Sequence, residues 1–266
     1  MLLRTTVILR LVLFNGRLEN PPKERFQPLL FLVFALLSGM DPGAGPSRPP
    51  PSRPAAYLVE LASAVEVGPT AADLSTVPVL GLYSFTVRFN MSSSRRSLAW
   101  SDLLNKLFID MNSLVEVEFH CSPDPPPGCF VRALPVYAEP AEQRKPVQRC
   151  PHHARPADIT NVNFEFVGQL VRADSPAAVY CEDLQSGRLS LLLPLRPASA
   201  LLRFLCLGSC PGGINRRPLL LVFTLEDGAA SILGRATVNL RICSCPRRDL
   251  NTEEARFAVV SDNSRR

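Results

Sequence analysis

Hydrophobic and polar residues alternate along several short stretches of the chain. In SLVEVEFHC, the apolar residues Val115, Val117 and Phe119 are separated by polar ones, which is the two-residue period of a strand with one buried face. The same period runs through RATVNLRICSC (235–245), where we expect the even-numbered residues to face inward and the odd-numbered ones, Cys243 among them, to face outward. These two stretches predict half-buried strands.

Other apolar runs are bounded by strong turn signals. PLLLVFTLE (218–226) is apolar without interruption, as in a strand that is covered on both faces. The proline-rich SPDPPPG (122–128) and the pair Asp227-Gly228 mark turns. Short strands separated by turns predict an all-β fold, an antiparallel β-sandwich. Short helices are expected only over WSDLLNKLF (100–108) and PRRDLNTEEARF (246–257), where proline suits the first helical position.

The N-terminal part of the chain has a different character. The run LLFLVFALL (29–37) follows basic residues and resembles a late signal peptide, but it is too short to span a membrane comfortably. The alternative that we favour is an extension, residues 1–39, outside the functional protein. Residues 41–56 are rich in proline, glycine, serine and arginine and are expected to be disordered. Residues 57–67, YLVELASAVEV, have apolar residues at helical spacing, and we favour a linker over a transient partner-binding helix.

These observations divide the chain into three parts. Residues 1–68 are expected to be a disordered, low-complexity extension that contains the apolar run. Residues 69–258 form the β-sandwich domain, and residues 259–266 are expected to be a disordered tail.

The basic residues are almost all arginine. Only three lysines occur, and the formal net charge is +5, which makes a negatively charged partner plausible without establishing one. Arg241 lies near the end of the second alternating stretch, and Arg247 and Arg248 fall in the first turn of the helix expected after it. A helix N-terminus is already positive, so arginines there are unfavourable unless a polyanion binds. Backbone N–H groups and guanidinium groups at such an end suit phosphates and base edges of DNA.

The cysteines allow two interpretations. Eight cysteines are an even number, which would suit a secreted disulfide-linked β-sandwich, but Cys243 and Cys245 lie two apart on one strand and cannot readily pair with each other. Two close pairs, in RCPHH and CLGSC, instead offer three thiolates and one imidazole, a typical structural zinc set. The four candidate ligands are Cys150, His153, Cys206 and Cys210. From spacing alone, structural zinc and buried free thiols both stay open.

At these residues the chain resembles the DNA-binding domain of the p53 tumour-suppressor family. The matching stretches are RCPHH, SCPGGINRRPLLLVFTLED, LGR, RICSCPRRD with TEE, PDPPPGCFVRALPVY and LNKLF. They occur in the family's order over about residues 78–257. The resemblance implies an immunoglobulin-like sandwich with a loop–sheet–helix DNA-binding surface and one structural Zn²⁺. It assigns the four candidate ligands to that zinc, with His152 as a non-ligand neighbour.

The resemblance also implies DNA-contact roles, position by position. Arg216 corresponds to the minor-groove arginine, Arg241 to a phosphate contact braced by Asp249, and Arg248 to the guanine reader of the major groove. The further contact positions are Ser209, Ser244, Cys245 and, in a loop about two residues shorter than the family's, Arg96 with Arg95 as second choice. Arg149 and Arg217 match arginines that brace the zinc loops.

Some positions depart from the family pattern. Asn251 replaces a basic phosphate contact, Leu250 a structural arginine, and Lys145 an acid that pairs with Arg217, so we expect weaker DNA binding and looser loops. We see no oligomerisation or strongly acidic activation segment and expect a fragment, a short isoform or an incomplete product.

The resulting hypothesis is a zinc-stabilised transcription-factor domain that binds double-stranded DNA, with self-association on DNA as a further partner hypothesis. It implies a nuclear protein, also able to reside in the cytoplasm, that regulates stress response, cell-cycle arrest and apoptosis. No enzymatic activity, small-molecule substrate or membrane association is expected. The alternatives are the secreted disulfide-linked binding module and a zinc hydrolase, which would need an open coordination position and a base such as Glu142 or Asp158.

Overall fold

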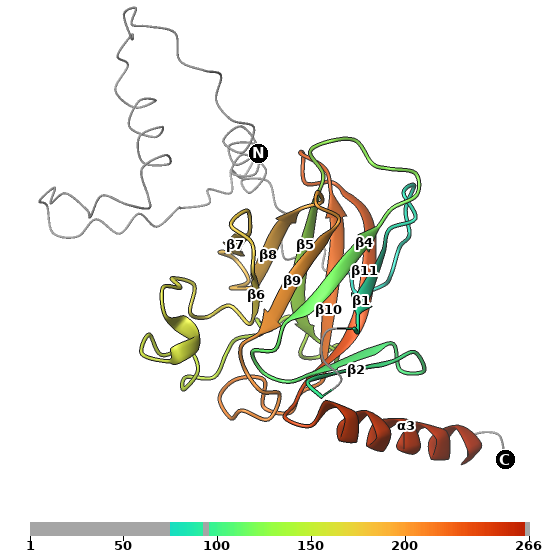
Figure 1. Ribbon diagram of the computed structural model, residues 1–266, viewed down its shortest axis with the longest axis vertical. Helices are drawn as coiled ribbons and strands as arrows, with labels where there is room; N and C mark the ends of the chain where they lie inside the picture. The colour runs from blue at the N-terminus through green and yellow to red at the C-terminus, as the bar shows by residue number, and fades with distance from the viewer. Residues whose placement is uncertain (1–74, 93–95, 264–266) are drawn as a thin grey trace, which may run out of the picture. The chain divides into compact units, whose positions relative to one another are not determined.

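Two β-sheets stack on each other to form a sandwich (Figure 1). The computed structural model describes residues 75–92 and 96–263; the predictions for residues 1–68, which include the apolar run, and for Arg95 lie outside this part. The smaller sheet has the order β1 (Thr86–Asn90), β4 (Val115–His120), β9 (Ser199–Phe204), β6 (Val171–Ala173). The larger has the order β2 (Leu98–Ser101), β3 (Lys106–Ile109), β11 (Ile232–Ile242), β10 (Leu219–Glu226), β5 (Phe130–Tyr137), β8 (Leu189–Pro194), β7 (Val179–Glu182). The described helices are η2 (Ile159–Asn161) and α3 (Pro246–Asn263).

The expected alternation is confirmed on the core-facing strands. In β4, Val115, Val117 and Phe119 are buried, and in β11 Leu240 is buried while Arg241 is exposed. The core between the sheets takes these side chains because each strand turns every second residue inward.

Strand β10 lies in the middle of the larger sheet, paired with β11 on one side and β5 on the other. Seven of its eight residues are buried, which confirms the prediction of a strand covered on both faces. Its last residue, Glu226, is 2% exposed and receives two hydrogen bonds from Arg132, at 2.8 and 2.9 Å. This bidentate pairing compensates two charges that are buried within the sheet.

The segment predicted to be a helix at residues 100–108 is instead a β-hairpin. Trp100 pairs with Leu107 across β2 and β3, and Asn105 takes a left-handed conformation in the connecting turn. Strand β3 then adds to β11 in parallel, so the larger sheet is mixed rather than purely antiparallel. The hairpin covers the end of β11, and for this reason Cys243, expected to face outward, is buried against Ala99 and Phe108.

Helix α3 lies across one end of the sandwich, where it packs on β2 and β3 (Figure 1). Its start at Pro246 agrees with the sequence prediction. The helix continues to Asn263, so the tail expected from residue 259 is helical as far as that residue. The strand end, the hairpin and the helix therefore build one end of the molecule together.

Candidate metal centre and nucleic-acid interface

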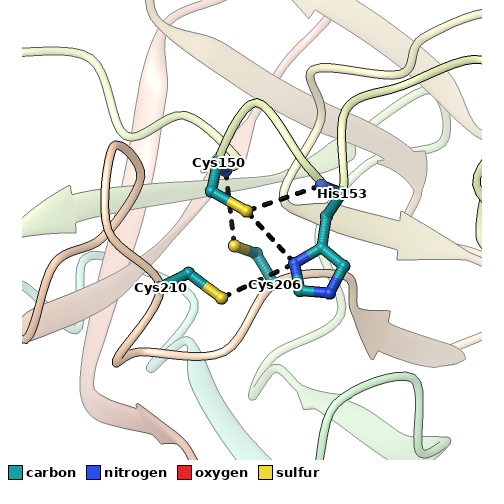
Figure 2. Close-up of side chains that lie close together, drawn as sticks. All are labelled: Cys150, His153, Cys206 and Cys210. Atoms are coloured by element: carbon teal, nitrogen blue, oxygen red, sulfur yellow. Dashed lines mark hydrogen bonds between the residues drawn. The ribbon is translucent and has the colours of Figure 1, made fainter.

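The four predicted metal ligands converge from two loops that are far apart in the sequence. Cys150 and His153 lie in the loop after β5, and Cys206 and Cys210 lie in the loop after β9 (Figure 2). One donor atom from each residue lies within 4.8 Å of the other three. The chain packs the two loops so closely that a Cβ on Gly213 would lie 2.6 Å from the backbone nitrogen of Cys150.

The distances in this cluster fit a tetrahedral zinc ion. The His153 Nδ1 atom lies 3.3 Å from the Cys150 Sγ atom and 3.6 Å from the Cys210 Sγ atom. Zinc bonds of about 2.3 Å to sulfur and 2.0–2.1 Å to nitrogen, at the tetrahedral angle, separate the two donors by about 3.6 Å. Three thiolates and one imidazole complete four-coordination, which is the donor set of a structural rather than a catalytic zinc.

Burial and hydrogen bonds shift the pKa values of these ligands. Burial raises the pKa of the Cys206 thiol to about 12 and also raises that of Cys210. It acts in the same direction on Cys150, but hydrogen bonds from the His153 backbone and the Cys206 thiol outweigh it and lower the pKa of Cys150. Burial lowers the pKa of His153, which favours the neutral imidazole that a metal requires. Because burial disfavours the thiolates of Cys206 and Cys210, a cation among the sulfurs would favour the ionised form of the cluster.

Arg149, next to the first ligand, ties the loop after β5 to its surroundings. Its side chain is almost fully buried and donates to the carbonyl oxygens of Leu205, at 2.9 Å, and Val167, at 2.8 Å. It also donates to Asn161 Oδ1, at 2.6 Å, and Thr160 Oγ1, at 2.8 Å. All four acceptors are uncharged, and burial lowers the pKa of Arg149.

Asn161 completes this brace from the other side. Its amide nitrogen donates to the carbonyl oxygen of His153, at 2.9 Å, and to that of Arg155, at 2.7 Å. Asn161 thus links the buried guanidinium of Arg149 directly to the backbone of a metal ligand. Sequence reasoning missed Asn161 and Thr160, because an isolated polar residue in a loop gives no pattern to detect.

Arg217 braces the other loop. It donates to the carbonyl oxygens of Gly213 and Ile214 and stacks on the Tyr137 ring at 3.9 Å. The sequence suggested that Lys145 leaves Arg217 without an acid, but Glu142 supplies one: its carboxylate lies 3.2 Å from Arg217 and 2.7 Å from Lys145. The expected loosening of this loop therefore does not follow from Lys145.

One backbone hydrogen bond joins the second metal loop to the end of β11, and another closes the loop on itself. Gly208 N–H donates to the carbonyl oxygen of Ile242, at 2.8 Å, and Arg216 N–H donates to the carbonyl oxygen of Gly208, at 2.6 Å. Ser209, between the two metal ligands of this loop, is exposed beside this junction. Asn215 and Arg216 both have positive φ, 52° and 61°, a left-handed turn that costs of order 1 kcal/mol per residue. The turn leaves the Arg216 side chain exposed.

A chain of alternating charges surrounds the start of α3. Arg241 contacts Asp249 at 2.9 Å and Glu253 at 3.2 Å. Asp249 also accepts from Arg248, at 3.2 and 3.3 Å, and Glu253 pairs with Lys106 at 2.6 Å. Although burial opposes the effect, hydrogen bonds from Arg241 and Arg248 hold the pKa of Asp249 below its ordinary value.

The remaining predicted contacts lie at the same end. The Cys245 carbonyl oxygen accepts the first helical hydrogen bond, from Asp249 N–H at 3.0 Å, so Cys245 and the exposed Ser244 immediately precede the helix. Arg96 is exposed two residues before β2, whose first residue, Leu98, pairs with Ile109, the neighbour of Ile242. The predicted DNA-contact residues are thus exposed around one end of the larger sheet.

The two alternative classes find little support. All eight cysteines, which lie in the described part of the chain, are free thiols, contrary to a disulfide-linked module. The two carboxylates considered for a zinc hydrolase are already engaged: Glu142 with Arg217 and Lys145, and Asp158 with Thr160. Among the described residues, no helix is both long and apolar enough to cross a membrane.

Comparison with known proteins agrees with this architecture. Residues 77–257 match the family model of the P53 DNA-binding domain. The chain is 34% identical over 252 residues to the cellular tumor antigen p53 of Oncorhynchus mykiss, covering 90% of this chain and 59% of that protein. It is 39% identical to the same antigen of Ictalurus punctatus over 197 residues, covering 69% of this chain and 52% of that protein. The chain thus spans between half and three fifths of the length of these curated relatives.

Proposed function

Because the chain belongs to the p53 DNA-binding domain family, we propose that residues 69–258 are the sequence-specific DNA-binding domain of a transcription factor. The observation that carries the proposal is the gathering of exposed arginines from three separate segments at one end of the sandwich. Arg216 comes from the second metal loop, Arg241 from β11 and Arg248 from α3. Side chains from loop, strand and helix around one surface suit a duplex that presents both phosphates and base edges.

Each arginine has a proposed role that its surroundings support. Arg248 lies in the first turn of α3 and is 74% exposed, so its guanidinium can leave Asp249 and pair with guanine O6 and N7. Arg241 is held by two carboxylates and suits a phosphate contact. Arg216 extends from a rigid left-handed turn and suits the minor groove. Arg96, Ser209, Ser244 and Cys245 complete the proposed interface.

One structural zinc ion belongs to the same proposal. It would be held by Cys150, His153, Cys206 and Cys210 and would join the two loops that support Arg216. No catalytic role is assigned to it, because protein donors fill the four positions of a tetrahedral ion.

We further propose a cellular location and role on the basis of the relatives named above. Similarity to the cellular tumor antigen p53 of two fishes supports a nuclear protein. In this proposal the protein regulates genes of stress response, cell-cycle arrest and apoptosis. Self-association on DNA remains a prediction.

The decisive experiment compares two arginine variants on a panel of single-base variants of a DNA sequence selected from a random pool. Arg248→Ala should flatten the preference at one guanine position, by about 1–3 kcal/mol. Arg241→Ala should weaken binding to all sequences alike, since phosphates carry no sequence information.

Arg196→Ala is a matched control. Arg196 is 57% exposed and pairs with Asp124 at the opposite end of the sheet, beyond the β8 residue Pro194 that pairs with Phe130. Its loss should leave both affinity and base profile nearly unchanged. If Arg248→Ala keeps the wild-type base profile and affinity, α3 is not the reading element and the proposal fails.

A further inference from the structure

A groove of about 330 Å³ lies beside α3, and none of the residues that line it is a proposed DNA contact. It is lined by Leu103, Leu104, Lys106, Asn239, Glu253 and Phe257. Two of its large apolar side chains face solvent, since Leu103 is 56% and Phe257 45% exposed. Apolar side chains grouped along a groove are typical of a docking surface.

The path of the chain before β1 leads to this groove. Val79 forms an antiparallel bridge with Arg235, and the Thr76 carbonyl oxygen accepts a hydrogen bond from Thr237 Oγ1 at 2.8 Å. Followed backwards from residue 79 to residue 76, the chain therefore advances along β11 towards Asn239. From Asn239 onwards the edge of β11 is occupied by β3, beginning with Lys106. The described chain therefore begins, at Ser75, near the point where β3 joins β11, and the two residues paired there, Asn239 and Lys106, both line the groove.

We propose that residues 57–67 of the same chain dock in this groove through their apolar side chains. In a helix these residues would gather Tyr57, Leu58, Leu61 and Val65 on one face, at spacings of one, three and four residues. The eight residues from 68 to 75 can span about 26 Å when extended, at about 3.3 Å per residue. The short connection holds the segment near the groove at a millimolar effective concentration, so a weak apolar contact is sufficient.

Charge is compatible with the same occupant. The segment carries Glu60 and Glu66 and no basic residue, and the exposed Arg256 precedes the groove residue Phe257 in sequence. The acidic side chain inside the groove, Glu253, is already paired with Lys106 and Arg241. It therefore repels an acidic segment less than an isolated carboxylate would. None of the groove residues is a proposed DNA contact, so this inference stands independently of the proposed function.

Hydrogen exchange of the full chain, read by mass spectrometry, tests the docking. In the wild type, the amide hydrogens of residues 57–67 should exchange at least about fivefold more slowly than in the Leu61→Asp variant, because docking protects them. Phe257→Ser should remove the same protection. Val162→Ser changes a 61% exposed apolar residue in another loop and should leave the protection intact.

The outcomes that would overturn the inference are distinct. Docking is excluded if residues 57–67 exchange equally fast in the wild type and in Leu61→Asp, or if their protection persists in Phe257→Ser. Protection that disappears on tenfold dilution would assign the groove to a second copy of the chain instead. Leu61 lies outside the described residues, and melting curves check that both Leu61→Asp and Phe257→Ser stay folded.

Discussion

Replacing Arg149 by lysine preserves the positive charge beside the metal centre but should remove about half of its side-chain hydrogen bonds. The guanidinium donates to four acceptors in three segments: the carbonyl oxygens of Leu205 and Val167, and the side chains of Asn161 and Thr160 in η2. The acceptors are placed around the planar guanidinium group. A lysine ammonium is a compact donor group and cannot reach all of them at once. The variant therefore tests whether the shape of the side chain, rather than its charge, holds the loop.

The expected magnitude follows from these contacts. If lysine keeps two of the four hydrogen bonds, two buried acceptors lose their partner, each at a cost of about 1–3 kcal/mol. We expect a loss of about 2–6 kcal/mol in the free energy of unfolding. For a domain of this size 1 kcal/mol shifts Tm by about 2–4 °C, so the melting temperature should fall by about 10 °C.

The assay combines thermal unfolding with the rate of zinc release to a chromophoric chelator. Arg172→Lys is the matched control: Arg172 donates one hydrogen bond, to the Thr160 carbonyl oxygen at 2.9 Å, and stacks on the Phe164 ring while remaining partly exposed. It should lower the stability by about 1 kcal/mol at most and leave zinc release unchanged. The reasoning is refuted if Arg149→Lys melts and releases zinc like the wild type, or if the control variant is equally damaged.

Three further predictions concern the metal, the minor-groove contact and pH. Native mass spectrometry should find about one zinc per chain, and Cys210→Ser should lower both zinc content and specific DNA binding; a zinc-free sample with full DNA binding would exclude the site. Arg216→Ala should weaken binding to all DNA sequences similarly and lower the salt slope by about one unit, whereas an effect at a single base position would contradict its role. The pKa of Asp249 is lower in the folded than in the unfolded chain, so its stabilising contribution is full above the unfolded value of about 3.8 and is lost as pH falls through the folded value. The stability difference between wild type and Asp249→Asn should therefore shrink as the pH falls below about 3.8, and a constant difference in Tm there would argue against the ion pairs.

Alternation and ligand spacing made much of this molecule predictable. The two-residue period of β4 and β11 predicted their buried faces, because a strand in a sandwich has one face in the core and one face exposed to solvent. Two close ligand pairs and the family resemblance identified the metal cluster before its geometry was known.

The hairpin of β2 and β3 shows where local pattern failed. Trp100, Leu103, Leu104, Leu107 and Phe108 recur at intervals of three and four residues, as in a helix. Parallel pairing of β3 with β11 overrides this period, and Leu103 is left exposed in the turn. Such pairing depends on a strand more than a hundred residues away, which a local pattern cannot report.

The partners of the bracing side chains were unpredictable for a related reason. Asn161 and Glu142 reach Arg149 and Arg217 only after the loops have folded against the sandwich. Their neighbours in sequence give no sign of these contacts. Contacts of this kind have to be read from the assembled structure.

The backbone junction at Gly208 has a consequence for samples that contain too little metal. This one residue bonds to Ile242 at the end of β11 and to Arg216 at the proposed minor-groove contact, and it lies between two ligands of the same ion. Losing the ion should therefore impair groove contacts from the loop and from the strand in the same molecules at the same time. A half-loaded preparation should behave as a mixture of fully competent and incompetent molecules. Titration with DNA should then give a reduced active fraction with an unchanged dissociation constant, rather than a uniform weakening.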